Sequence, residues 1–141
     1  MIKQFVAVAL LVSIPSAARG DDAKSVEGTW LAAAAELGGG KFPDEVRKSI
    51  KLVIADGNYT VTVGKNPDVG TVTVDPSKTP KTMDIVGTEG PNKGKTILAI
   101  YERTGDTLRI CYDLGGKARP SEFKTTAGTR LFLVDYQLAK P

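Results

Sequence analysis

The chain has 141 residues, with 19 Lys and Arg against 16 Asp and Glu, one cysteine and no histidine. The absence of histidine excludes Ser-His-Asp triads, Cys-His dyads and histidine-built zinc sites. A single cysteine excludes an intramolecular disulfide. Cys111 lies in a strand-like apolar stretch, where a free cysteine is usually a small buried hydrophobe. A reactive thiol or an intermolecular bridge is the alternative interpretation.

Residues 1–20 have the layout of an export signal. A lysine precedes the almost entirely apolar run 5–14, and the small residues 16–18 lead to candidate cleavage sites after Ala18 or Gly20. The apolar run is about half as long as a bilayer-spanning helix, which disfavours the alternative of an uncleaved anchor. We therefore expect a signal peptide and an exported protein, periplasmic or extracellular, with no transmembrane segment after cleavage.

Cleavage after Gly20 would leave one domain, residues 21–141. It removes two of the 19 basic residues, Lys3 and Arg19, and none of the 16 acidic ones, so 17 basic residues remain. The remaining charges alternate in sign along the chain and form no basic cluster. The sequence therefore predicts neither nucleic acid nor an anionic membrane surface as a partner.

Residues 28–37 are the first predicted strand. The alanines at 32–35 have high helix propensity, but the run is short and three glycines, 38–40, end it abruptly. Small side chains also suit a place where two backbone layers approach closely. A strand is therefore favoured over a helix.

Residues 43–49 predict a two-turn helix. Pro43 fits the first helical position, and acidic residues precede basic ones as the helix dipole favours. In such a helix we expect Phe42 and Val46 to face the core.

The rest of the chain alternates between apolar and polar residues with the period of β-strands. An Asp56-Gly57 hairpin signal follows the first of these segments, and turns are predicted at 65–68, 75–80, 104–106 and 114–118. The strands are predicted at 50–54, 59–63, 69–74, 82–86, 96–103, 107–113, 120–125 and 130–138. Short connections favour an all-β fold, an antiparallel up-and-down meander barrel of about eight strands with one short helix after the first strand.

A set of segments then occurs in a characteristic order: Glu27–Trp30, Asn58–Val61, Asp75–Lys81, Glu89–Thr96, Gly105–Cys111 and Arg119–Phe123. Over residues 25–139 the chain resembles a lipocalin-like domain family of planctomycete exported proteins, whose function is uncharacterised. The resemblance implies a calycin-type barrel and an exported location but no activity. The alanines at 32–35 depart from the bulkier residues usual there, which would leave a wider cavity.

Gly28-Thr29-Trp30 is typical of the entrance to such barrels, where the Trp fills the closed end. Trp30 is therefore predicted to be a structural plug, with an arginine packed on its ring. Arg130 is the first candidate for that arginine and Arg119 the second. The alternative is that Trp30 stacks on a ligand.

The predicted ligand-binding residues follow from strand parity: Leu31, Ala33, Tyr59, Tyr101 and Tyr112, with Arg109 as a candidate for a charged contact. Tyrosines also fill cores, which is the alternative for all three. A single bulge would invert the facing of a strand.

No catalytic residues, metal site or cofactor are predicted. Residues 90–96 differ from a nucleotide-binding P-loop, because three residues separate their glycines instead of four and a strand-like segment follows instead of a helix. The acidic residues are scattered and form no calcium-binding loop. Glu36, Glu102 and Glu122 are conceivable acids, but nothing in the sequence pairs them. An enzyme is therefore not expected.

We expect a binding module that holds a small apolar or amphipathic molecule in its barrel. The alternative is a packed barrel that acts as a protein-interaction or envelope-structural domain without a small-molecule ligand. The presence of an interior cavity distinguishes the two hypotheses.

Overall fold

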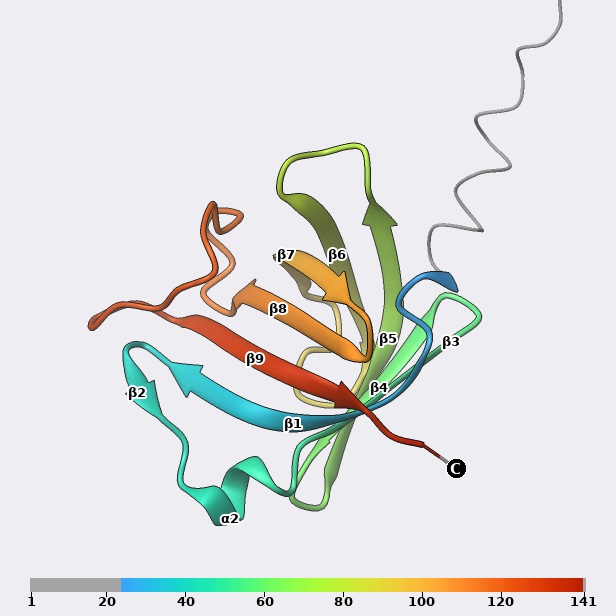
Figure 1. The fold of residues 1–141 in the computed structure, drawn as a ribbon. Coiled ribbons are helices and arrows are strands. Elements are labelled where there is room, and N and C mark those ends of the chain that lie inside the picture. The colour runs from blue at the N-terminus through green and yellow to red at the C-terminus, as the bar shows by residue number, and fades with distance from the viewer. Residues whose placement is uncertain (1–23, 141) are drawn as a thin grey trace, which may run out of the picture.

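The computed structural model describes residues 24–140, so the predicted signal peptide lies outside the described residues. These residues form one antiparallel sheet that closes into an eight-stranded barrel, with a two-residue strand, β2, attached to its first strand (Figure 1). The elements are β1 (Gly28–Leu37), β2 (Gly40–Lys41), α2 (Asp44–Arg47), β3 (Lys51–Ala55), β4 (Asn58–Val63), β5 (Asn66–Asp75), β6 (Lys81–Glu89), β7 (Thr96–Thr104), β8 (Thr107–Asp113) and β9 (Leu131–Leu138). The predicted all-β meander barrel is confirmed.

Strand β1 closes the barrel by pairing with two neighbours. Its residues 28–31 pair with β3 and its residues 30–37 pair with β9. A bulge between Ala32 and Ala34 interrupts the second register. Bulges bend a strand and increase its twist, so the bulge and the small alanine side chains suit a strand that passes from one partner to the other. Every other barrel strand pairs with the next one along the chain.

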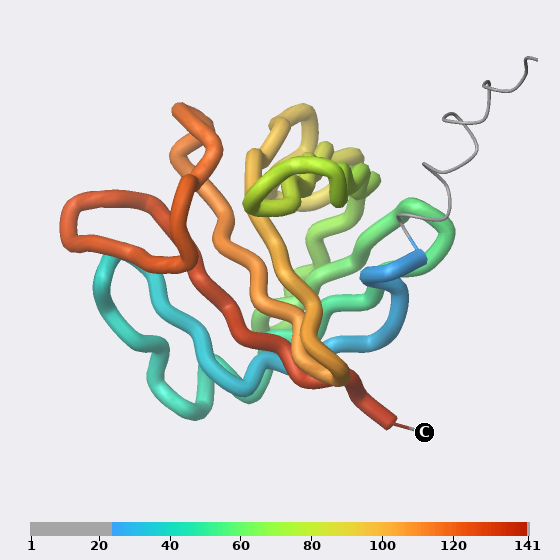
Figure 2. The backbone as a smooth tube through the Cα atoms, turned by 45° about the horizontal axis from the view of Figure 1, so that its top comes forward, coloured from blue at the N-terminus to red at the C-terminus, as the bar shows by residue number. Residues whose placement is uncertain are grey.

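The alternation of strand directions gives the barrel two different ends. We call one end the closed end: it contains the start of β1, the end of β9 and the β7–β8 turn. At the open end, β1 runs into β2, and β8 is joined to β9 by residues 114–130. Figure 2 shows this long connection beside the β1–β2 turn, and the Gly39 amide donates to Thr125 Oγ1 over 2.9 Å.

The core lies inside the barrel. Inward-facing side chains come from alternate positions of the strands, as a sheet with one buried face requires. The side chains with at most 1% of their surface exposed include Val26, Trp30, Ile50, Met83, Ala99, Leu108, Ile110, Val134 and Tyr136. Cys111 is also fully buried, but it is absent from this core cluster and its Sγ lies 3.7 Å from the Lys124 carbonyl.

Two predicted elements are shorter or displaced. The helix predicted at 43–49 is one turn, Asp44–Arg47, with Pro43 as its cap, and Val46 is 39% exposed instead of facing the core. The predicted turn at 65–68 shrinks to a two-residue hairpin connection, because Val63 already pairs with Asn66. Phe42 does pack against the core, as expected.

The strand predicted at 120–125 does not form. Strand β8 pairs directly with β9 along its whole length, so the barrel has no ladder position left for another strand. The segment is fixed instead by side chains at its two ends. Arg119 donates to the carbonyls of Met83 and Ala99, and Thr125 bonds to Glu36.

Candidate functional site

The barrel contains a cavity of about 180 Å³ towards its open end. Strands β3 to β9 all contribute to its lining. Most of the wall is aliphatic, formed by Leu52, Ile54, Val61, Val63, Val72, Met83, Ile85, Ile97, Ile110 and Leu114. Met83, Ile110 and Tyr136 belong both to this lining and to the buried core, so the cavity is bounded by core side chains.

The mouth of the cavity is apolar and partly aromatic. Val63 is 42% exposed and joins the cavity to solvent. Phe132 lies at the start of β9, where its ring centroid is 5.5 Å from that of Tyr112 and 5.4 Å from that of Phe42. These rings form a continuous aromatic wall from the β2–α2 segment into the cavity.

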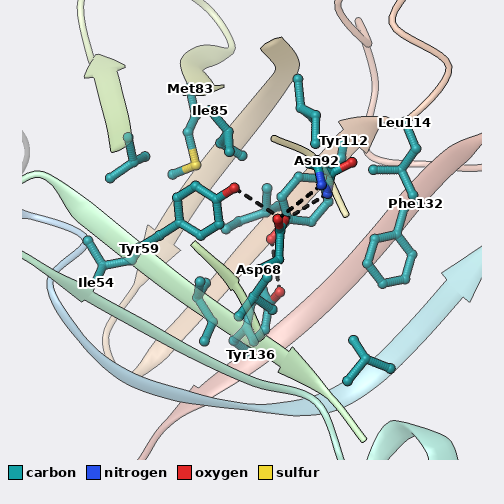
Figure 3. Close-up of a pocket in the computed structure, with 16 residues that line it drawn as sticks. Ile54, Tyr59, Asp68, Met83, Ile85, Asn92, Tyr112, Leu114, Phe132 and Tyr136 are labelled. Carbon is teal, nitrogen blue, oxygen red and sulfur yellow. Dashed lines mark hydrogen bonds between the residues drawn. The ribbon is translucent and has the colours of Figure 1, made fainter. Parts of the chain in front are cut away.

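A single charged side chain, Asp68, lies among these apolar groups. It is on an inward-facing position of β5 and only 7% exposed. Its Oδ2 accepts hydrogen bonds from Tyr59 Oη at 3.2 Å and from Asn92 Nδ2 at 2.7 Å, and its Oδ1 accepts one from the Asn92 amide at 3.3 Å (Figure 3). Burial, together with the charge of Asp68 and the hydrogen bond to it, raises the pKa of Tyr59.

The β6–β7 loop reaches this position because glycines let it fold inward. A Cβ on Gly87 would lie 2.0 Å from the Asn92 carbonyl oxygen, and one on Gly90, at φ +93°, would lie 2.6 Å from the Pro67 carbonyl oxygen. Larger residues would push the loop out of the barrel. The glycines thus place Asn92 over Asp68 and make the loop part of the cavity wall.

A second polar pair lies deeper in the cavity wall. The hydroxyls of Tyr112 and Tyr136 are 2.9 Å apart and hydrogen-bonded. Burial raises the pKa of both phenols, so both remain neutral well above neutral pH. The site therefore combines an apolar wall with three tyrosine hydroxyls, the amide of Asn92 and the carboxylate of Asp68.

The predicted ligand residues divide into two groups. Tyr59 and Tyr112 line the cavity, whereas Tyr101 is buried elsewhere in the core. Leu31 and Ala33 are exposed, because Trp30 and Ala32 occupy the inward positions of β1 before the bulge. The expectation that these two residues face inward is wrong.

Arg109 also lies outside the cavity. It is on the outer face of β8, where its Nε is 2.8 Å from Asp135 and its Nη1 is 3.8 Å from Glu102. The hydrogen bond that Arg109 donates to Asp135 raises the pKa of this guanidinium. The charge of Arg109 is balanced by these two carboxylates. Its position outside the cavity does not support the interpretation of Arg109 as a ligand contact.

Trp30 occupies the position predicted for the plug, but the arginine packed on its ring is neither of the two predicted ones. It has no exposed surface, and its Nε1 donates to the Val26 carbonyl over 3.0 Å. Arg103, from the end of β7, lies 5.0 Å above its ring and donates to the Ser25 carbonyl. Arg130 is exposed at the open end, and Arg119 pairs with Asp84, so neither is the partner of Trp30.

Sequence reasoning missed Asp68, Asn92 and Tyr136 as cavity residues. The alternation of residues along the last strand, which puts Phe132 and Tyr136 on one face, could have indicated Tyr136. Asp68 fell in a predicted turn, and Asn92 is in a loop whose inward fold depends on contacts with β5. Neither position has a local signal.

Comparisons with models of known families, with curated proteins and with solved structures find no match for this chain. Among residues 24–140, no helix has the length and apolar character needed to cross a bilayer. In the same part of the chain, no three acidic or cysteine side chains are grouped as metal ligands would be. The case for function therefore rests on the cavity.

Proposed function

We propose that this protein is a non-enzymatic binding module that holds a small apolar or amphipathic molecule in the open half of its barrel. The observation that carries the proposal is the cavity of about 180 Å³ with its largely apolar lining. Eight-stranded barrels are wide enough either to fill with side chains or to hold one small ligand. A cavity of this size speaks against the packed-barrel alternative.

The volume limits the size of the ligand. An apolar protein cavity of about 150 Å³ holds one benzene molecule. The site therefore suits about seven to nine non-hydrogen atoms, well below the size of a long-chain fatty acid.

We also propose that the chain is an exported member of the lipocalin-like family that its sequence resembles. The closed meander barrel with Trp30 at its closed end supports this assignment. An exported location, periplasmic or extracellular, would let the barrel meet small molecules outside the cytoplasm. The export signal predicted at residues 1–20 supports this location.

Methyl NMR of the cavity isoleucines tests the binding function. Addition of toluene is expected to shift the methyl signals of Ile54, Ile85 and Ile110, which line the cavity. Val61→Trp places a large ring in the cavity wall and is expected to abolish these shifts. Val86→Trp is the matched control, since Val86 is 40% exposed and outside the cavity lining.

The proposal is contradicted if toluene and larger apolar molecules shift none of these methyl signals in the wild-type protein. It is also contradicted if Val86→Trp abolishes the shifts as Val61→Trp does. Native mass spectrometry of protein purified from the exported fraction provides an independent check. A discrete adduct lost on denaturation is expected, and its mass identifies the natural ligand.

A further inference from the structure

The cavity has an unusual charge balance. Among residues 24–140, Asp68 is the only lining residue with a formal charge, and only 7% of its surface is exposed. The remaining polar lining residues are three tyrosines and Asn92, all neutral. The interior of the binding site thus carries one negative charge and no positive charge.

Other carboxylates of the barrel are compensated in two ways: Asp113, also 7% exposed, accepts hydrogen bonds from three backbone amides, whereas two less buried ones pair with arginines. Asp135 has Arg109 at 2.8 Å, and Asp84 has Arg119 at 2.6 Å. Within residues 24–140, no ion pair includes Asp68. A carboxylate removed from water is costly unless it is paired, and neutral donors compensate it less well than a cation does. A cation that enters the cavity would find an unmatched charge.

Asp68 also has acceptor capacity left. A carboxylate offers about four acceptor positions, and the three hydrogen bonds from Tyr59 and Asn92 use three of them. The bond to Oδ1 is long, at 3.3 Å. Oδ1 is therefore the atom that would accept a further donor from a ligand.

The surrounding rings favour the same class of ligand. Tyr59, Tyr112 and Phe132 line the cavity together with Asp68 (Figure 3). Aromatic faces attract cations through their quadrupole, and more strongly in a desolvated site. The aliphatic wall would hold the apolar part of the same molecule.

We propose that the barrel selects small apolar amines, with the ammonium group bound to Asp68 and the hydrocarbon part in the aliphatic half of the cavity. The inference rests on the proposed binding function and names its ligand class. A ligand carboxylate is disfavoured, because it would face Asp68 and, among residues 24–140, no cationic side chain lines the cavity.

Three probes with the same ring test the charge preference: benzylamine, benzyl alcohol and benzoate, titrated at neutral pH into the full-length mature protein. Hydrogen bonds to charged groups are roughly twice as strong as neutral ones. Wild-type protein is therefore expected to bind benzylamine about tenfold more tightly than benzyl alcohol, with benzoate the weakest. This comparison needs no variant.

Asp68→Asn keeps the shape of the side chain and is expected to remove the preference, so that benzylamine binds no more tightly than benzyl alcohol. Glu89→Gln is the matched control, because it removes one negative charge at the same end of the barrel from an exposed position. It is expected to retain the preference. Circular dichroism confirms that both variants are folded.

The outcomes separate the two proposals. Equal binding of benzylamine and benzyl alcohol by wild-type protein, or an amine preference that survives in Asp68→Asn, overturns the assignment of amines but leaves the binding function intact. Failure of all three probes, and of toluene, to bind overturns both.

Discussion

The two ends of the barrel bury polar groups in opposite ways. At the closed end, the indole N–H of Trp30 is satisfied by Val26, and the charge of Arg103 lies over the ring at the protein surface. At the open end, Asp68 is buried with neutral donors only, beside an unfilled volume. The comparison shows that one barrel can have an end suited to stability and an end suited to binding. The difference lies in which side chains point into the barrel at each end.

The largest effect is expected from Trp30→Ala at the closed end. The substitution leaves a large void among fully buried side chains and is expected to reduce the free energy of unfolding by about 3–5 kcal/mol. Denaturant unfolding followed by circular dichroism measures it. Leu31→Ala on the next residue is the control, since Leu31 is 45% exposed, and it should change stability by less than about 0.5 kcal/mol.

At the open end, Asp113→Ala is expected to cost about 1–3 kcal/mol, because three backbone amides lose their acceptor. Asp113 is 7% exposed and accepts hydrogen bonds from the amides of Gly115, Lys117 and Ala118 at 2.8–2.9 Å. Glu122→Ala is the control, because Glu122 is exposed and lies in the connection between β8 and β9. Equal losses in the two variants would contradict a specific role for Asp113.

The same carboxylate predicts a pH dependence. Burial alone would raise the pKa of Asp113, but the backbone hydrogen bonds outweigh burial and the pKa lies below its ordinary value. Because the folded pKa is below the unfolded one, the stabilisation is fully present above about pH 4 and is lost as the pH falls through the folded pKa. Denaturation curves of wild-type protein and Asp113→Ala should therefore converge at acid pH.

A smaller effect is expected from Arg103→Ala, which tests whether Arg103 or Arg130 supports the plug. It removes a cation–π contact with Trp30 and a hydrogen bond to Ser25, and should cost about 1 kcal/mol. The exposed Arg130, changed to alanine, should alter stability by less than about 0.5 kcal/mol. A larger loss from Arg130→Ala would reverse the assignment.

The cavity tyrosines are expected to have the smallest effect on stability at neutral pH, because they ionise only at alkaline pH. Burial raises the pKa of Tyr59, Tyr112 and Tyr136 above the ordinary value of about 10. The unfolded chain therefore ionises first, so stability is unaffected below about pH 10 and falls as the pH rises above it. Tyrosinate absorbance should appear together with loss of the circular dichroism signal; an early rise from all four tyrosines in folded protein would contradict their burial.

The sequence by itself determined the class and order of the fold. Period-two alternation, the Asp56-Gly57 hairpin and short turns specified eight of the nine strands and their meander, because these are local properties of the chain. Two of the cavity tyrosines, Tyr59 and Tyr112, also followed from strand parity. The Gly-x-Trp at the first strand correctly placed Trp30 in the interior.

Only the tertiary structure decided which side chains face the cavity and which charges meet. The inward positions of β1 belong to Trp30 and Ala32, so Leu31 faces out, and nothing in the alanine run signals this parity. Asp68 and Asn92 are 24 residues apart and meet because the β6–β7 loop folds into the barrel. Such contacts depend on strand register and on loop conformation in three dimensions, which no local pattern of residues specifies.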